Sequence, residues 1–555
     1  MIAAGRGLLL WLGRTWTGAV VLYLALLLPL LLPTLLDPTS WPGAYTESNL
    51  RAIWIATALA TKGLAAKPMV FEPVRATWQT LADGDLAPYW LVSHLQRGLG
   101  EHLGYVLSLA AMLLSAALSV RALCHSQTRS EVGSTLAGAL TLLHPGLVGA
   151  VMDGDLPLGM LAVPTLAVLF SVRGATLGSL PRLLVGGLLA GVTTWVCWQW
   201  AVALLPLLAI ALVAMTWRSR TLLGVAIWGA LAAIGVAGAL ELGLATRADE
   251  WAPGPPELSG AGTELILRYL GGQGSGYVQN SLAGGSALVL FPTALFAVGL
   301  AAGWRAWRGW WLALAAVAVM AAGPGLPAEM GNIPLPMLGL MRAIPALRMI
   351  AEPDRWALLA IIPAAVLASA GAGRVALTLG MPGLERAKGV MAGVLGAIAI
   401  AALNGQLPGG HFTLDVAPLP GVVAQTPDAA VFVPADNARA TLAWRIVHPI
   451  IPAVGGPARN WMNRAPKEFN SYAERNTVLR ALYGWTPMPA PISGLDIQDL
   501  NDRGVSLIVV DRNLVDLEAS VYETLLTNLA LTFGSPTYQT EDATVFRLYS
   551  QGGSP

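Results

Sequence analysis

The chain has 555 residues, of which 55% are hydrophobic and 12% are charged, and its mean hydropathy is +0.61. Soluble domains are about 25% charged, so this composition excludes a wholly soluble protein, and its apolar content excludes disorder. The near balance of 33 Lys and Arg against 32 Asp and Glu leaves no basic stripe for nucleic acid. Two cysteines exclude a disulfide framework. The composition therefore predicts a polytopic α-helical membrane protein.

Charged residues are unevenly distributed along the chain. Residues 405–555 carry 14 acids and 10 bases, whereas the first 404 residues carry 41 charges. This shift predicts a transmembrane domain over 1–404 and a soluble domain over 405–555. In the second part, β-branched runs predict strands and amphipathic runs predict helices, which together indicate an α/β domain. The expected strands are 431–434, 506–511 and 544–548, and the expected helices are 474–483 and 514–531.

Long uncharged stretches predict about 11 membrane spans, because a spanning helix needs about 20 apolar residues. The first, from Thr15 to Leu36, has no cleavage site after it, so we expect a retained anchor rather than a signal peptide. The tryptophans between Trp195 and Trp200 suit an interfacial turn between two spans. The expected spans are 15–36, 104–121, 134–151, 156–172, 183–198, 200–217, 221–243, 285–303, 310–323, 355–373 and 389–404.

The basic residues indicate the orientation of the transmembrane domain. With 11 spans, the short connections on the N-terminal side carry 13 Lys or Arg and two acids, whereas the opposite loops carry 10 bases and 16 acids. Cytoplasmic loops are enriched in Lys and Arg. We therefore expect a bacterial inner-membrane protein with a cytoplasmic N-terminus and a periplasmic or extracellular C-terminal domain.

Three long loops are expected on the outer side, at 37–103, 244–284 and 324–354. Long loops in compact proteins tend to carry function. The sequence shows no internal repeat and almost no charge inside a span, which disfavours a transporter. The outer membrane surface is therefore expected to be the working face.

The first outer loop contains an early acid, Glu47. A helix is expected from Leu50, with Ser48 or Asn49 as its cap. A partly desolvated carboxylate at the membrane surface can act as a general base toward a hydroxyl group. The alternative is a solvated acid that is stabilised by the helix dipole. Glu47 is the candidate catalytic base, and Arg51 is a candidate substrate-binding residue.

The short connection between the third and fourth spans reads Asp153-Gly154-Asp155. In an extended turn, two carboxylates separated by one residue can point the same way and bind Mg²⁺ or Mn²⁺. The alternative is a polar turn in which Asp155 caps the next helix. We treat Asp153 and Asp155 as candidate catalytic and metal-binding residues. A second pair, Asp83 and Asp85, is explained by a turn in a solvated loop.

Three further residues are candidates for substrate binding. His144 lies in the outer half of the third span, where it is either a site residue or a buried polar residue beside a proline. Arg348 and Arg355 lie on the outer side, against the positive-inside trend, and the forked guanidinium group suits phosphate. The alternative partners for these arginines are Glu352 and Asp354 or lipid head groups.

This layout resembles the GT-C class of integral-membrane glycosyltransferases and, more narrowly, the bacterial YfhO-like membrane proteins. The resemblance is carried by Glu47, by the turn 153–155, by Pro353-Asp354-Arg355 before the apolar stretch 356–372, and by the strands of the C-terminal domain. It implies a polyprenyl-phosphate sugar as donor and transfer with inversion at the outer leaflet.

These observations lead to one favoured function and two alternatives. The favoured function is transfer of a sugar from a polyprenyl-phosphate donor to an extracytoplasmic lipid, glycan or protein. Glu47 would be the base, Asp153 and Asp155 would bind metal or acceptor, and Arg348 and Arg355 would hold the phosphate. One alternative is a ligase or polymerase of lipid-linked glycans. The other is a non-catalytic membrane subunit that scaffolds an envelope assembly.

Overall fold

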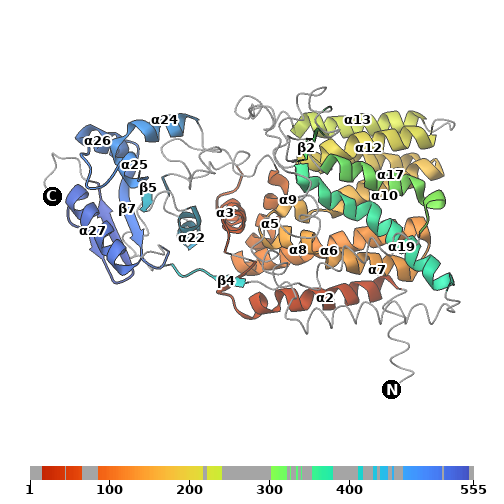
Figure 1. Ribbon diagram of the computed structural model, residues 1–555, viewed down its shortest axis with the longest axis horizontal. Helices are drawn as coiled ribbons and strands as arrows, with labels where there is room; N and C mark the ends of the chain where they lie inside the picture. The colour runs from red at the N-terminus through yellow and green to blue at the C-terminus, as the bar shows by residue number, and fades with distance from the viewer. Residues whose placement is uncertain are drawn as a thin grey trace, which may run out of the picture.

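In the computed structural model, one part of the chain forms a helical bundle and another forms a small sheet with helices (Figure 1). The helices α3 and α22 lie between these two parts (Figure 1). The described residues are 15–43, 45–64, 85–216, 222–239, 302–321, 325–326, 333–334, 339, 353–378, 411–416, 429–433, 438–447, 453–454, 467–484, 486–514 and 518–548.

The transmembrane part is mostly helical. Its α-helices are α2 (Trp16–Leu36), α3 (Glu47–Lys62), α5 (Leu86–Leu99), α6 (Glu101–Thr128), α7 (Glu131–Leu142), α8 (Pro145–Met152), α9 (Leu156–Gly159), α10 (Ala162–Leu177), α11 (Leu180–Val196), α12 (Trp198–Thr216), α13 (Leu222–Ala239), α17 (Trp304–Ala321) and α19 (Ile361–Thr378). A 3-10 helix, η5 (Pro353–Ala360), precedes α19, and two short strands, β2 (Gly325–Leu326) and β3 (Ile333–Pro334), pair with each other.

Six helical segments among the described residues are long and apolar enough to cross a membrane. They are Trp16–Leu36, Glu101–Thr128, Leu156–Leu177, Trp198–Thr216, Leu222–Ala239 and Trp356–Arg374. The helices α7 and α8 form a bent pair with an angle of 43°, which gives a seventh span if the pair counts as one. The spans expected at 183–198 and 310–323 correspond to the helices α11 and α17, which are not among the six. Those expected at 285–303 and 389–404 lie almost wholly outside the described residues.

Small residues allow close packing between helices in the bundle. A Cβ atom added to Gly191 of α11 would lie 3.2 Å from the Cα atom of Gly235 in α13, and one added to Gly187 would lie 2.8 Å from the backbone oxygen of Trp228. Membrane helices associate mainly through such contacts, because lipid provides no hydrophobic force between them. The glycines of α11 therefore explain why it packs directly on α13.

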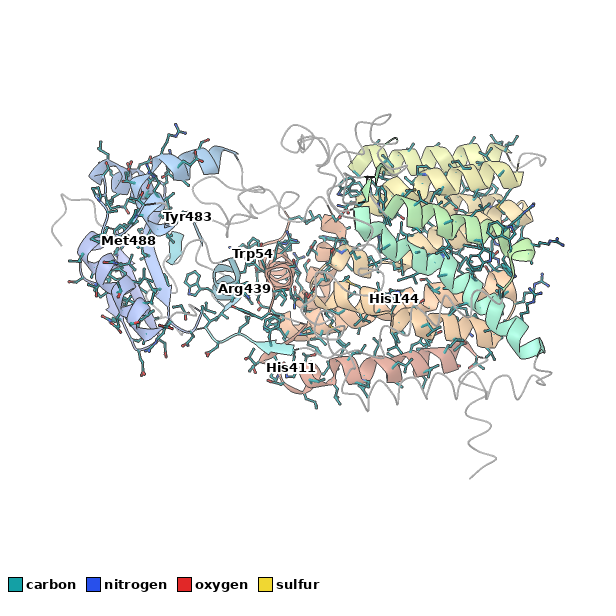
Figure 2. All side chains as sticks on the ribbon, in the orientation of Figure 1. Trp54, His144, His411, Arg439, Tyr483 and Met488 are labelled. Atoms are coloured by element: carbon teal, nitrogen blue, oxygen red, sulfur yellow. The ribbon has the colours of Figure 1, made fainter. Side chains whose placement is uncertain are left out.

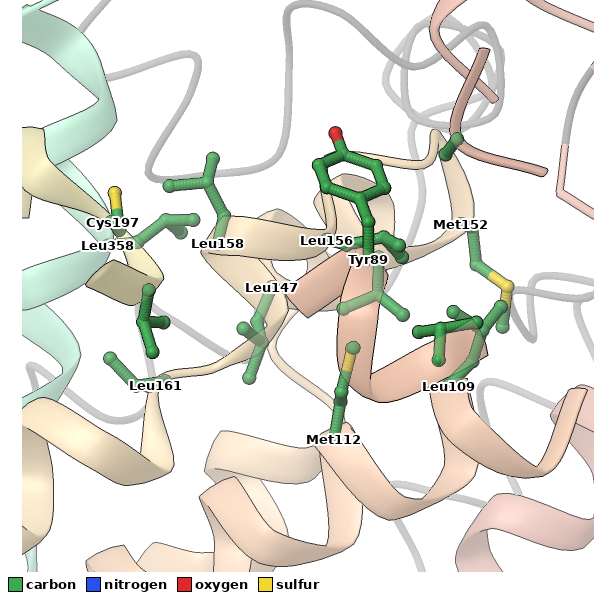
Figure 3. Close-up of a cluster of buried hydrophobic side chains, with 14 of the residues drawn as sticks. Tyr89, Leu109, Met112, Leu147, Met152, Leu156, Leu158, Leu161, Cys197 and Leu358 are labelled. Carbon is green, nitrogen blue, oxygen red and sulfur yellow. The ribbon is translucent and has the colours of Figure 1, made fainter. Parts of the chain in front are cut away.

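An apolar cluster lies beside the connection between α8 and α9, at the α3 end of the bundle (Figure 3). It includes Tyr89 of α5, Met112 of α6, Met152 of α8 and Leu156 of α9, all of which are buried. These side chains come from four helices. Their packing therefore holds the turn 153–155 in place at this end of the bundle.

The C-terminal part contains a five-stranded sheet with the strand order β6-β5-β7-β9-β8. The strands β5 and β6 are parallel, as are β5 and β7, whereas β9 is antiparallel to both β7 and β8. The strands are β5 (Ala429–Val433), β6 (Ala453–Val454), β7 (Val505–Asp511), β8 (Tyr538–Gln539) and β9 (Ala543–Arg547). The helices are α22 (Ala438–Val447), α24 (Lys467–Arg475), α25 (Thr477–Leu482), α26 (Gly494–Asp502) and α27 (Ala519–Phe533). The expected strands thus correspond to β5, β7 and β9.

The two parts are joined by a short antiparallel ladder between β1 (Ser40–Pro42) and β4 (His411–Thr413). The strand β1 follows the first span, and β4 precedes the C-terminal sheet in the chain. The ladder therefore anchors the C-terminal part to the loop that contains Glu47.

Candidate functional site

Glu47 is the first residue of α3. The Thr46 hydroxyl caps this helix by accepting a hydrogen bond from the Asn49 backbone N–H at 3.3 Å. The expectation of a helix from Leu50, with Ser48 or Asn49 as its cap, is therefore wrong by three residues. The reason is that Thr46 provides the cap one turn earlier, which places Glu47 in the first turn, where the helix dipole favours a carboxylate.

The helix α3 presents different residues on opposite sides. With 100° of rotation per residue, Glu47 and Arg51 share one face, whereas Asn49 and Ala52 lie on the other. The helices α3 and α22 contact each other, and Arg439 of α22 lies near enough to Glu47 to act on it electrostatically, which places the first face on the α22 side. Figure 2 shows Arg439 beside α3, close to Trp54. The two sides of α3 are described in turn below.

On the α22 side, one carboxylate lies near two guanidinium groups. Glu47 is half-buried, and burial raises the pKa of its carboxyl above the ordinary value of 4.5. The positive charges of Arg51 and Arg439 oppose this shift without cancelling it. A carboxylate with a raised pKa is a stronger base than a solvated one. This arrangement can accept a proton from a hydroxyl group while the arginines stabilise an anion.

Tyr45 connects this face of α3 with the C-terminal sheet. Its half-buried phenol has a pKa that is raised by burial, lowered by Arg439 and raised by Asp511 at the end of β7. Its ring also contacts Phe412 of β4, with the ring centroids 5.5 Å apart. Tyr45 of the first loop and residues of β4, α22 and β7 therefore lie near one another at the start of α3.

On the opposite face of α3, the acidic turn packs against the helix backbone. A Cβ atom added to Gly154 would lie 2.6 Å from the Asn49 Cα atom and 2.8 Å from the Ser48 backbone oxygen. Asp153 is buried and follows α8, whereas Asp155 is half-buried and precedes α9. Asp155 makes no side-chain capping bond to α9, so capping does not account for its carboxylate. The structure thus brings the Asp153–Asp155 turn into contact with the first turn of α3, on the face opposite Glu47.

The described residues contain no group of three or more His, Cys, Asp or Glu side chains that could hold a metal ion. Within the described part of the chain, Asp153 and Asp155 therefore form at most a two-carboxylate site. Mg²⁺ is commonly bound through one or two carboxylates together with substrate phosphates and waters, so the donor set of this turn is compatible with such an ion.

Asn49 holds the start of α3 on the loop and on α6. Its side-chain amide donates a hydrogen bond to the Pro42 carbonyl at 2.8 Å and accepts one from the Tyr105 hydroxyl at 3.1 Å. Beside it, the Trp41 ring contacts the rings of Tyr105 and His102. All of these contacts orient the helix that carries Glu47.

The other predicted site residues are not brought to Glu47 by the described part of the structure. His144 is buried at the break between α7 and α8, and Figure 2 shows it within the bundle, away from α3. Arg348 lies outside the described residues, and only the backbone of Arg355 is described, at the start of η5. Asp85 accepts a hydrogen bond from the Trp198 backbone N–H at 2.9 Å, which is a structural role.

Sequence reasoning missed Arg439 and Asn49 as parts of this site. Arg439 lies in the C-terminal domain, and no spacing rule connects a residue there with the first loop. A weak signal existed for Asn49, because a buried helix with a polar residue in its first turn requires hydrogen-bond partners for that residue.

Comparisons with solved structures identify the fold. The arabinofuranosyltransferase AftD from Mycobacteria has a TM-score of 0.52 and 15% identity, over 98% of this chain and 40% of that chain. ArnT from Cupriavidus metallidurans has a TM-score of 0.51 and 13% identity, over 97% of this chain and 99% of that chain. This chain thus spans about two fifths of the length of AftD and nearly all of ArnT.

The sequence matches no protein-family model, and the search of curated proteins found no match. The structural likeness nevertheless shows that the chain has the fold of GT-C glycosyltransferases, and six helical segments among the described residues are long and apolar enough to cross a membrane. The predicted GT-C-like, mostly helical fold is therefore confirmed, whereas the number of about 11 spans and the narrower YfhO-like resemblance stay predictions.

Proposed function

We propose that this chain is a membrane glycosyltransferase that transfers a sugar from a polyprenyl-phosphate donor to a hydroxyl-bearing lipid, glycan or protein. The observation that carries the proposal is Glu47, a half-buried carboxylate that lies near Arg51 and Arg439 at one end of a GT-C-type bundle. The fold supports the class of reaction, and the charges around Glu47 support the chemistry.

In the proposed reaction, Glu47 accepts the proton of the acceptor hydroxyl while the hydroxyl oxygen bonds to the anomeric carbon of the sugar. The bond from that carbon to the phosphate oxygen breaks, and polyprenyl phosphate leaves with one more negative charge. Positive groups stabilise this developing charge, and Arg51, Arg348 and Arg355 are the proposed sources. Attack opposite the leaving group inverts the anomeric carbon.

Asp153 and Asp155 are the proposed ligands of a divalent cation, Mg²⁺ or Mn²⁺, or alternatively of acceptor hydroxyl groups. Such a cation would supply positive charge near the phosphate. The turn that carries the two carboxylates packs against the first turn of α3 on the face opposite Glu47, so a cation bound there would act from the other side of the helix that carries the base.

We also propose that the membrane part has about 11 spans, a cytoplasmic N-terminus and a C-terminal α/β domain on the outer face. The location of Glu47 supports this arrangement, since α3 and the acidic turn lie at the same end of the bundle as the C-terminal sheet (Figure 1). The membrane would be the bacterial inner membrane. The narrower resemblance to YfhO-like proteins belongs to the same proposal.

One observation favours a second candidate function, a scaffold without catalysis. An attraction between Glu47 and Arg439 is also what a purely structural contact between α3 and α22 would require. In that case the same charges would hold the C-terminal domain in place for partner proteins. A test must therefore separate loss of chemistry from loss of docking.

The test is Glu47→Gln, with Glu101→Gln as its matched control. Glu101 is the first residue of α6 and lies at the same end of the bundle. Glycan transfer is measured in membranes supplied with polyprenyl-phosphate sugars. We expect E47Q to lower transfer about 10²- to 10⁴-fold with unchanged thermal unfolding, and E101Q to retain activity. Unchanged transfer in E47Q would remove Glu47 as the base, whereas wild-type membranes that transfer no more sugar than membranes without the protein would remove the enzyme proposal and leave the scaffold.

A further inference from the structure

The C-terminal sheet has a topological switch point that faces the candidate site. The chain runs from β5 through α22 to β6 on one side of β5, and then through α24, α25 and α26 to β7 on the other side. In such sheets, ligands bind outside the carboxyl ends of the strands, where the connections diverge. Here that place is the carboxyl ends of β5 and β7.

Two charged residues at this switch point lie near Tyr45 of the first loop. Arg439 is in the first turn of α22, which follows β5, and Asp511 is the last residue of β7. Both act electrostatically on the Tyr45 phenol: Arg439 lowers its pKa, and Asp511 raises it. Figure 2 shows Arg439 between the sheet and α3. The ligand-binding edge of the sheet is thus directed at the helix that carries Glu47.

The two charged residues of the switch point differ in how accessible their side chains are to a ligand. The buried Asp511 carboxylate accepts hydrogen bonds from the backbone N–H groups of Asn513 at 3.0 Å and Leu514 at 3.3 Å, which stabilise the turn after β7. The Arg439 side chain is exposed, although it lies beside the half-buried Glu47. A guanidinium group in this position can reach an anionic ligand at α3.

We propose that Arg439 binds the phosphate of the lipid-linked donor, so that the substrate site is built jointly by α3 and by the switch-point edge of the C-terminal sheet. This inference rests on the proposed function. Two guanidinium groups, of Arg51 and Arg439, act on the single carboxylate of Glu47. Both guanidinium groups would attract a phosphodiester monoanion, and the phosphate gains a second negative charge when the sugar leaves.

The test measures binding of undecaprenyl phosphate and of uncharged undecaprenol to the full-length protein in nanodiscs. The variants are Arg439→Gln and Arg439→Lys, with Arg480→Gln of α25, an exposed arginine, as control. We expect R439Q to weaken binding of undecaprenyl phosphate about 10- to 100-fold. The lysine variant should lose less, because it keeps the charge but not the fork. Binding of undecaprenol, and all binding by R480Q, should match the wild type.

Glu47→Gln separates phosphate binding from simple docking of α22. If Arg439 binds phosphate, removing the carboxylate reduces repulsion, so E47Q should bind undecaprenyl phosphate more tightly than the wild type while R439Q binds it more weakly. If the two residues only hold α22 on α3, both variants should loosen the contact and raise protease sensitivity between the two parts. Equal affinity of R439Q and wild type for undecaprenyl phosphate would overturn the inference, as would an equal loss for undecaprenol.

The outcomes also separate this inference from the proposed function. Arg439-dependent phosphate binding without any sugar transfer would leave the inference intact and remove the transferase. Sugar transfer that R439Q carries out with unchanged affinity and rate would do the reverse. A wild type that does not bind undecaprenyl phosphate would overturn the inference together with the proposed donor.

Discussion

Burial and neighbouring charges shift the pKa of the Glu47 carboxyl in opposite directions, and the pH dependence of activity reports the resulting pKa. Burial raises its pKa above 4.5, and the positive charges of Arg51 in α3 and Arg439 in α22 lower it. The acidic turn with Asp153 and Asp155 packs against the opposite face of α3. A general base must be ionised, so kcat/KM should fall as the pH decreases through this raised pKa.

The resulting prediction concerns Arg51→Gln. This change removes a positive charge that stabilises the ionised form of Glu47, so the pKa should rise further and the acidic limb of the kcat/KM profile should move to higher pH. An opposite charge near a carboxyl typically shifts its pKa by about 1–3 units when buried and by less at a half-exposed position. The Arg480→Gln profile should coincide with that of the wild type. A limb that stays in place or moves to lower pH in R51Q would contradict the assignment of Glu47 as the base.

At the level of single residues, the sequence pointed to Glu47 and to the acidic pair but not to their surroundings. Glu47 could be found because it is the acid that follows the first expected span, although a helix start is also a structural reason for an acid at this position. Its cap was misread because several residues in this segment are suitable caps, and only the structure shows that Thr46 is the one used. Arg439 could not be found, since its role depends on how two distant segments pack.

At the level of elements, the turn between α8 and α9 is defined by its approach to α3. Gly154 has φ +78°, which disfavours other residues, and a Cβ atom there would lie 2.6 Å from the Asn49 Cα atom. Gly100, between α5 and α6, has φ +88° but no atom within 4 Å of its added Cβ. A substitution at Gly100 therefore has a conformational cost alone, whereas one at Gly154 has a conformational cost and a steric cost.

We predict that Gly154→Ala destabilises the protein more than Gly100→Ala. Both variants carry a backbone cost of about 1–3 kcal/mol for a non-glycine residue at positive φ, whereas only G154A forces the acidic turn away from α3, which adds about 1–3 kcal/mol. Thermal unfolding in detergent measures the difference, and transfer activity should fall in G154A alone. Equal unfolding temperatures for the two variants would show that the turn is not tightly held against α3.

Elements with a strong pattern were predictable, and those defined by contacts were not. Hydropathy located α2, α6, α12 and α13, because long apolar runs leave few alternatives. The third expected span is instead the bent pair α7 and α8, broken at His144 and Pro145. The ladder between β1 and β4 left no pattern, since three-residue strands have too few positions to show alternation.

At the level of the whole molecule, the two ends of the bundle differ in the residues they present. One end carries α3, the acidic turn and the C-terminal sheet (Figure 1). At the other end, the buried Arg121 of α6 pairs with Glu131 at 3.0 Å and lies over the Trp16 ring at the start of α2. The connection between α10 and α11 belongs to this second end, because α10 begins close to the acidic turn and runs away from it. The basic connections and the proposed site are therefore separated by the thickness of the bundle.

This separation predicts which introduced cysteines react from outside the cell. The native Cys124 and Cys197 are both buried with 0% exposure, so they should give little background. Ser520→Cys in α27 and Thr176→Cys near the end of α10 both replace exposed residues at opposite ends of the protein. With Lys and Arg retained on the cytoplasmic side, a membrane-impermeant maleimide should label S520C in intact cells. T176C should be labelled only after permeabilisation. The reverse pattern would place Glu47 and the C-terminal sheet in the cytoplasm, where a donor presented at the outer leaflet could not reach them.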